Sequence, residues 1–227
     1  LPQGATLATK GVVLALADGI SSSEVSQVAS EAAVRSFIDD YYATSQAWSV
    51  RRSAQQVIAA SNSWLHAQTL RSAYRHDKDQ GYVCTLSVLV LRSTTAHLFH
   101  VGDSRIYRLA GEALEPLTED HRVWSSPGHS HLSRALGFNE HLEIDYLALP
   151  LAAGDVFVMA TDGVYEHTDG PFIAAVLREH AGDLDAAAAE YARVLEYAAA
   201  HADAELEARA SNNFAMVESI QGRKERA

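Results

Sequence analysis

Acidic residues follow strongly apolar segments at three places in the 227-residue chain. Asp18 ends the run GVVLALAD, Asp103 lies in VGDSR, and Asp162 ends the run DVFVMATD; a glycine is next to each of them. Apolar runs of this length are typical of buried strands, so we expect each aspartate at a strand end. Like charges that gather at one sheet edge need compensation, which Mg²⁺ or Mn²⁺ would supply through oxygen ligands. The pattern therefore indicates a divalent-metal site, with ordinary Asp-Gly turns as the alternative.

The spacing of apolar residues predicts the elements that position these aspartates. A strand at 11–18, expected to be buried on both faces, precedes helices at 23–43 and 54–69. Ser21 stands three residues before Glu24, which predicts a capping box at the start of the first helix. Further strands are expected at 83–91, 96–101, 105–109, 144–149 and 155–163, then helices at about 171–180 and 184–201, and a last strand at 213–220.

Three connections complete this prediction. Residues 72–81 are polar and indicate a loop, and Gly102-Asp103 predicts a tight type II′ turn between neighbouring strands. Residues 118–140 show little periodicity and are expected to be irregular. Helices and strands in separate blocks favour an α+β fold, with two antiparallel sheets face to face and helix pairs outside. We expect one domain over 1–220, followed by a charged tail or linker at 221–227.

Composition narrows the choice of partners and compartment. The net charge of −11 disfavours nucleic acid and anionic membranes as partners. No apolar run reaches the roughly 18 residues that a membrane-spanning helix needs. The single cysteine, Cys84, excludes an internal disulfide and suits a reducing cytosol, so a cytoplasmic location is expected.

Six segments carry a resemblance to a known family. DGISSSEVSQVAS, HVGDSRIYRL, LTEDHR, LSRALG, GDVFVMATDG and SNNFAMV, in this order, resemble the type 2C, or PPM, metal-dependent Ser/Thr protein phosphatases over about residues 10–220. The DGISSS variant resembles bacterial proteins in which this domain is fused to a protein kinase. The resemblance implies a four-layer fold, an antiparallel β-sandwich flanked by helix pairs. It also implies hydrolysis of phosphoserine and phosphothreonine in proteins by a metal-activated water.

The resemblance also implies a ligand set for Mn²⁺ or Mg²⁺. Asp18 would bridge two ions, the Gly19 carbonyl would bind one of them, and Asp162 would bind the other. Asp18 and Asp162 would therefore form the catalytic centre. Asp103 would hold a third, weaker ion, and Asn212 takes the place of the family's last aspartate ligand. The implied partners are phosphorylated proteins, namely a Ser/Thr kinase or the substrates of that kinase, and 118–134 resembles the family's mobile flap.

Departures from the family pattern support a second hypothesis. Asn212 keeps a carbonyl oxygen but loses the charge of an aspartate, and residues 1–10 lack the family's N-terminal Arg and acidic motif. A catalytically impaired pseudophosphatase that binds phosphoproteins or a kinase is therefore the alternative. We expect Ser21–Ser23 to cap a helix. Arg105 is expected to pair with Asp103 or a neighbouring carboxylate, with contact to phosphate as the less favoured alternative. His121 is expected to be solvated or to pack in the protein, with contact to substrate through the flap as the less favoured alternative.

Overall fold

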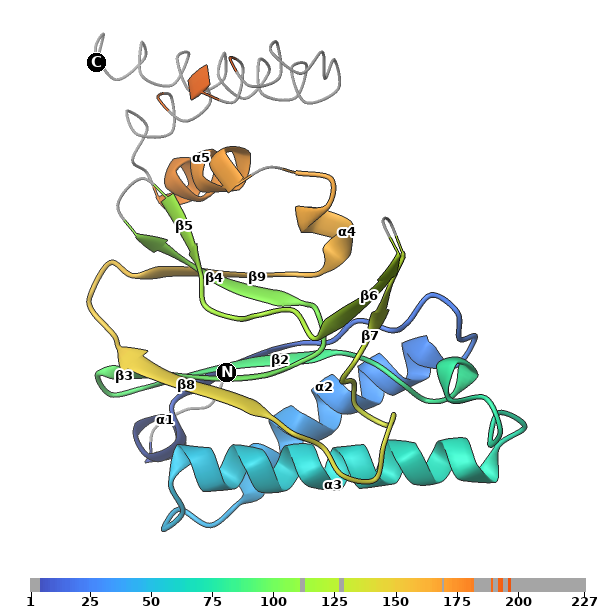
Figure 1. Cartoon of the computed structure of the whole chain (residues 1–227). Helices are drawn as coiled ribbons and strands as arrows, with labels where there is room; N and C mark the ends of the chain where they lie inside the picture. The colour runs from blue at the N-terminus through green and yellow to red at the C-terminus, as the bar shows by residue number, and fades with distance from the viewer. Residues whose placement is uncertain are drawn as a thin grey trace, which may run out of the picture. The chain divides into compact units, whose positions relative to one another are not determined.

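A computed structural model of the chain describes residues 5–110, 113–126, 129–168 and 170–181, together with 189, 192, 193 and 196. Its contacts divide the chain into two units. The first comprises 1–106, 117–154 and 159–161, and the second comprises 107–116, 155–158 and 162–227. Figure 1 labels the elements of both units.

A four-stranded antiparallel sheet forms the centre of the first unit. Its strand order is β1-β2-β3-β8. Val88 of β2 pairs with Ala15 of β1 and with Phe99 of β3, and Phe99 in turn pairs with Tyr146 of β8. The strands span Val12–Leu16 (β1), Leu86–Arg92 (β2), Thr95–Val101 (β3) and Asp145–Pro150 (β8).

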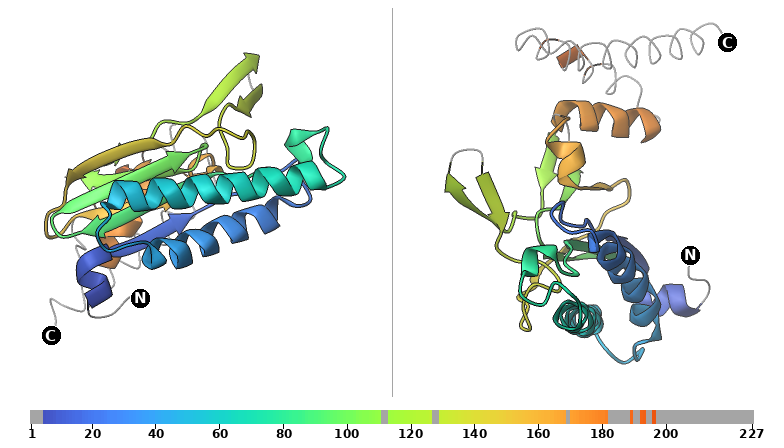
Figure 2. Two further views of the ribbon diagram at one scale, coloured as in Figure 1. Left: turned by 90° about the horizontal axis from the view of Figure 1, so that it is seen from below. Right: turned by 90° about the vertical axis from the view of Figure 1, so that its right-hand side faces the viewer.

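Two long helices, α2 and α3, cover one face of this sheet (Figure 1), and they lie side by side along its strands (Figure 2). Helix α2 spans Ser26–Ala43 and α3 spans Val50–Arg71, where Ser49 accepts a hydrogen bond from the Arg52 amide at the N-terminus. Because successive strand residues point to opposite faces, alternate residues of each strand meet the helices. The buried core between them includes Phe37, Tyr41, Ile58, Leu65, Leu86, Val88, Val90 and Phe99.

The short helix α1, Ala5–Lys10, leads into β1 and ends in a buried lysine. Lys10 Nζ donates to Thr44 Oγ1 at 2.6 Å and to the Ser45 carbonyl at 2.9 Å, in the loop between α2 and α3. Burial, with the nearby charge of Arg92, lowers the pKa of Lys10. These bonds fix the start of β1 against the helix pair.

The expectation that the first strand is buried on both faces is wrong. Strand β1 is the edge of its sheet, and Leu14 is 43% exposed. Strands β2 and β3, in the middle of the sheet, are the ones with most of their residues buried. An apolar run alone does not distinguish an edge strand from a central one, because strand order depends on pairing partners far along the chain.

The capping box predicted at Ser21 and Glu24 is also not formed. Helix α2 begins at Ser26, and its N-cap, Val25, makes no side-chain capping bond. The hydroxyl of Ser23 donates to the carbonyls of Gln80 and Gly81, and Ser22 donates to the Asp79 carbonyl. The serines therefore connect the approach to α2 with the loop that contains the 3₁₀ helix η1, Lys78–Gln80.

Gly102-Asp103 does not form the predicted hairpin turn. Strand β3 ends at Val101, and the next strand, β4 (Arg105–Ala110), pairs in a different sheet. Gly102 has φ +110°, which disfavours other residues, and a Cβ there would lie 2.6 Å from the Thr85 side chain. The connection is thus a crossover between sheets that is packed tightly against Thr85.

The segment expected to be irregular contains a β-hairpin. Strands β6, Arg122–Ser126, and β7, His129–Leu132, pair antiparallel, with Arg122 opposite Leu132 and a bulge between Trp124 and Ser126. The strands were missed because their residues are mostly polar and one of them is bulged. Trp124 is 65% exposed on this hairpin.

The second unit holds most of a three-stranded sheet with the order β5-β4-β9, where β5 is Ala113–Pro116 and β9 is Val156–Ala160. Arg108 of β4 donates to Asp155 at 2.7 Å, just before β9. Two helices follow, α4 at Asp162–Tyr165 and α5 at Gly170–Ala181. Helix α5 confirms the helix predicted at 171–180.

The α+β class with antiparallel sheets and helices is confirmed. The four-layer sandwich and the single domain over 1–220 stay predictions. The last predicted strand at 213–220 and the tail at 221–227 lie outside the described residues, as does nearly all of the helix predicted at 184–201. Among the helices that the structure describes, each is too short or too polar to cross a membrane.

Candidate active site

Asp18 lies two residues beyond β1, and hydrogen bonds of its backbone fix its position. Its amide donates to Thr85 Oγ1 at 3.0 Å, and its carbonyl accepts from the Thr85 amide at 2.7 Å. Side chains at Val13, Ala15 and Ala17 pack toward the helices. Alternation along the extended chain then directs the side chain of Asp18 to the opposite face of the sheet. The peptide that carries this carboxylate is therefore held in one position.

Gly19 follows at the point where the chain turns toward α2. A Cβ at this position would lie 2.7 Å from Cβ and Oγ of Ser26 and 2.8 Å from the Ser26 backbone carbon. Only glycine allows this close approach. The family resemblance implies a role for the Gly19 carbonyl, and the packing against Ser26 is a second requirement for glycine that is not visible in the sequence.

A chain of hydroxyl groups connects Asp18 to the crossover after β3. Thr85 Oγ1 lies 2.8 Å from Ser104 Oγ, and Ser87 Oγ lies 2.9 Å from His100 Nδ1 and 3.3 Å from the Ser104 carbonyl oxygen. All four side chains are buried. A buried polar network of this kind is rigid when every member has a partner, so the segments of Asp18 and Asp103 are positioned together.

His100 ends this network. Its Nε2 lies 3.1 Å from the Glu119 carbonyl, which can only accept a hydrogen bond, so Nε2 carries the ring proton and Nδ1 accepts from Ser87. Burial, together with the neighbouring ring of His121, lowers the pKa of His100 to about 4. His100 is therefore neutral at neutral pH.

His121 fastens the crossover from the other side. The Gly102 amide donates to His121 Nδ1 at 3.0 Å, so the ring proton is on Nε2, which donates to Asp145 at 2.9 Å. Burial alone would raise the pKa of Asp145, but hydrogen bonds from His121 and Arg134 outweigh it and lower that pKa. His121 is buried and packs in the protein, as the favoured expectation held.

Asp103 lies in the crossover with its carboxylate against the hairpin. Arg122 Nε donates to Asp103 Oδ2 at 2.6 Å. Arg105, by contrast, binds the neighbouring Asp120 through two bonds of 2.8 Å. The expectation that Arg105 pairs with a nearby carboxylate is thus confirmed, with Asp120 as the partner, and Arg122 was missed.

Cys84 is buried next to this region and is not a nucleophile. Burial, together with the nearby charge of Asp18, raises the pKa of the Cys84 thiol to about 12. A thiol of that pKa stays protonated at neutral pH. Cys84 is therefore a small residue of the core.

Comparison with known proteins identifies the family. The family model described as protein phosphatase 2C matches residues 4–208 of the chain. The chain belongs to the protein phosphatase 2C family. This phosphatase 2C chain is 28% identical over 170 residues to the serine/threonine phosphatase stp of Listeria monocytogenes, an alignment that covers 67% of the chain and 66% of the relative. It is 25% identical over 177 residues to the protein phosphatase PhpP of Streptococcus pneumoniae, with 70% and 69% covered. The chain thus spans just under two thirds of the length of the first relative.

Solved structures show the same fold. PppA of Pseudomonas aeruginosa matches with a TM-score of 0.60 at 25% identity, over 73% of this chain and 72% of that one. The phosphatase PstP/Ppp of Mycobacterium tuberculosis matches with a TM-score of 0.61 at 22% identity, over 71% and 73%. The chain therefore has a phosphatase 2C fold of antiparallel sheets and helices, as the motifs predicted.

The predicted metal ligands of this phosphatase 2C chain are distributed over both units. Asp18, Gly19 and Asp103 belong to the first unit, and Asp162 belongs to the second, where it begins α4 and its carboxylate accepts from the Gly163 amide at 2.8 Å. Asn212 lies outside the described residues. Among the residues that the structure describes, no three His, Cys, Asp or Glu side chains form a metal-binding group. The ligand set stays a prediction, and its donors, carboxylate and carbonyl oxygens, are chemically suited to Mn²⁺ or Mg²⁺.

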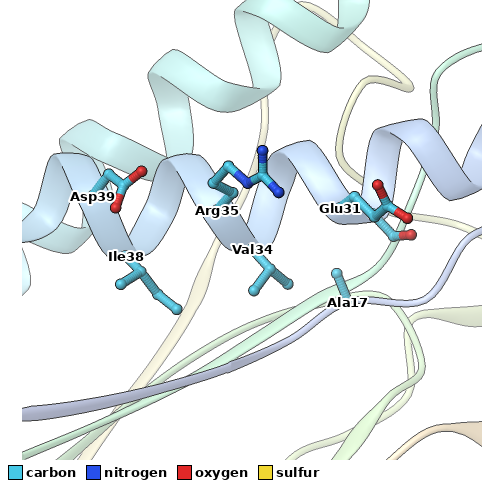
Figure 3. A pocket seen from close by; sticks show the side chains of 7 residues that line it. Ala17, Glu31, Val34, Arg35, Ile38 and Asp39 are labelled. Carbon is cyan, nitrogen blue, oxygen red and sulfur yellow. The ribbon is translucent and has the colours of Figure 1, made fainter. Parts of the chain in front are cut away.

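A groove of about 500 Å³ lies on the helix side of the chain before Asp18. Figure 3 shows Val34 and Ile38 of α2 pointing toward the chain segment that carries Ala17, with the charged groups of Arg35 and Asp39 directed away from it. Since Ala17 faces the helices and Asp18 faces away, this groove is on the other side of the sheet from the Asp18 carboxylate.

Sequence reasoning found the acidic residues but missed the side chains that position them. Thr85, Ser87 and His100 sit at alternate positions of apolar strands, on the face opposite α2 and α3. Polar residues at two alternate positions of an otherwise apolar run, as at Thr85 and Ser87, are a signal that could have marked this network. Their pairing with Ser104 and Glu119 depends on the crossover, which the sequence did not show.

Proposed function

We propose that this phosphatase 2C chain hydrolyses phosphoserine and phosphothreonine in proteins with divalent metal ions as cofactors. The observation that carries the proposal is the match of the family model to residues 4–208. Similarity to relatives described as Ser/Thr phosphatases supports the same substrate class. One matching structure, the catalytic domain of PstP, is described as a complex with two manganese ions, which supports Mn²⁺ as the cofactor.

Asp18, the Gly19 carbonyl and Asp162 would hold the metal pair, with Asn212 as a further ligand. A metal pair of this kind supplies, when bound, a water of lowered pKa for attack on phosphorus. The chain's own contribution is to keep Asp18 in place. The two hydrogen bonds to Thr85 fix the Asp18 peptide, and the close contact of Gly19 with Ser26 fixes the next one. Catalysis by positioned groups depends on such rigidity.

Hydrolysis of p-nitrophenyl phosphate and of phosphoserine and phosphothreonine peptides with Mn²⁺ tests the proposal. Asp18→Ala should lower the rate by about 100-fold or more, which corresponds to a loss of about 3 kcal/mol of transition-state stabilisation. Asp40→Ala removes an exposed carboxylate of α2 and should leave the rate unchanged. Equal rates in the wild type and Asp18→Ala would exclude catalysis at this position.

The second candidate is a pseudophosphatase that binds a phosphoprotein or a kinase without turnover. Asn212 favours it, because the amide has no charge to neutralise a divalent ion. Binding of a phosphopeptide to the wild-type chain, measured by calorimetry, with no release of phosphate in the presence of Mn²⁺, would support this candidate over the enzyme.

The partners that this function implies are a Ser/Thr kinase or the phosphoproteins that the kinase produces. A kinase on the same polypeptide and a cytoplasmic location belong to the same proposal. They are supported by the resemblance of the DGISSS segment to kinase-fused phosphatases and by the single, buried cysteine.

A further inference from the structure

The β6–β7 hairpin is attached to the crossover after β3 at two consecutive residues. The His121 amide donates to the Gly102 carbonyl at 2.8 Å, and the Gly102 amide donates back to His121 Nδ1 at 3.0 Å. Next to this pair, Arg122 Nε reaches Asp103 Oδ2 at 2.6 Å. Because Arg122 is also the first residue of β6, its side chain links the base of the hairpin to Asp103.

The contact between Arg122 and Asp103 is well shielded from solvent. The Asp103 side chain is 10% exposed and that of Arg122 is 18% exposed. Arginine keeps its charge at every ordinary pH, so the guanidinium provides a permanent positive charge at this carboxylate. A short, charge-assisted bond in a shielded place is among the stronger polar interactions in proteins.

A divalent cation at Asp103 would bind the carboxylate that Arg122 already holds through Oδ2. It would also lie close to the guanidinium, and like charges at such a distance repel strongly where water is largely excluded. The two cations are therefore alternatives for this carboxylate. A weak third ion, as expected at Asp103, is what such competition would produce.

We propose that Arg122 and a divalent cation compete for Asp103, and that cation binding there releases the Arg122 side chain at the base of the β6–β7 hairpin, while His121 still holds Gly102. The occupancy of Asp103 would then determine whether the side chain of Arg122, the first residue of β6, is held at the crossover. Trp124 stands two residues after Arg122 in β6 and is 65% exposed, so it is placed to respond to this release. The proposal concerns binding alone and does not depend on hydrolysis.

Binding of Mn²⁺, measured by calorimetry and by electron paramagnetic resonance of the free ion, tests the competition. Arg122→Ala should bind the Asp103-dependent ion about tenfold more tightly than the wild type, since one opposing charge is removed. Adding Asp103→Asn to that variant should abolish the gain. Arg134→Ala removes a guanidinium that pairs with Asp145 instead, and should leave the affinity unchanged. Equal affinity in the wild type and Arg122→Ala would overturn the proposal.

A second measurement does not need Arg122→Ala to fold. In the otherwise wild-type chain, Mn²⁺ should change the fluorescence of Trp124, obtained as the difference from Trp124→Phe. Asp103→Asn should remove this change. A change of the same size in Asp103→Asn, or no change in the wild type at millimolar Mn²⁺, would contradict the coupling between Asp103 and the hairpin.

Discussion

Replacing His100 with glutamine should remove a large part of the pH dependence of stability. In the folded chain the pKa of His100 is lowered to about 4, against an ordinary value of 6.5, mainly because the ring is buried. As the pH falls below 6.5, the unfolded chain gains a proton at this residue, but the folded chain does not do so until about pH 4. The folded state therefore loses stability over this window and has its full stability above pH 6.5.

The size of the effect follows from the separation of the two pKa values. A difference of one pKa unit is equivalent to about 1.4 kcal/mol. The free energy of unfolding should therefore fall by about 3 kcal/mol between pH 7 and pH 4 through His100 alone. Glutamine keeps an amide that can donate to the Glu119 carbonyl but does not titrate. The variant should be less stable than the wild type at pH 7 and should lose less stability on acidification.

Urea unfolding at pH 7, 6, 5 and 4.5, followed by circular dichroism, measures this difference. The quantity compared is the slope of the unfolding free energy against pH. The other histidines contribute equally to both slopes, so their contributions cancel in the difference. His76→Gln, at an exposed histidine of the loop after α3, is the matched control and should keep the wild-type slope. Parallel slopes for His100→Gln and the wild type would refute the assignment of a neutral, buried ring.

Two further predictions concern the predicted metal centre. Gly19→Ala should destabilise the metal-free chain by about 1–3 kcal/mol in thermal unfolding, because the new methyl group would meet Ser26 at 2.7 Å. Gly170→Ala, where a Cβ meets nothing within 4 Å, is its control and should cost little, whereas equal losses would contradict the packing argument. Asn212→Asp should increase both Mn²⁺ affinity in calorimetry and the rate of phosphate release, since it adds a charge to the ligand set. No gain in either would show that residue 212 is not a ligand.

The sequence was sufficient for the parts of the fold that depend on local pattern. Helices α2 and α3, the central strands β2 and β3, and α5 follow from periodicity within one segment. The sequence was insufficient where pairing between strands from distant segments decides the strand order. The edge position of β1 depends on β2, about 70 residues later, and the crossover at Gly102 depends on the sheet that β4 joins.

The candidate site divides in the same way. Asp18, Asp103 and Asp162 were recognised because strand, acid and glycine are adjacent in the sequence. The partner of Asp103 was missed, since Arg122 is 19 residues away in a segment without periodicity. The serines before α2 were assigned to capping because local bonds are the common use of serine, whereas Ser23 bonds to carbonyls 57 and 58 residues later.

The hydroxyl chain from Asp18 to His100 restricts how this sheet can diverge in sequence. Thr85 and Ser87 each have two partners, so one apolar replacement leaves a neighbour in the interior without its bond. Apolar substitutions in this chain are therefore destabilising one at a time. They become acceptable when all of the hydrogen-bonded side chains are replaced together by apolar side chains of equal volume. Lineages of this fold should therefore keep or lose these residues as a block.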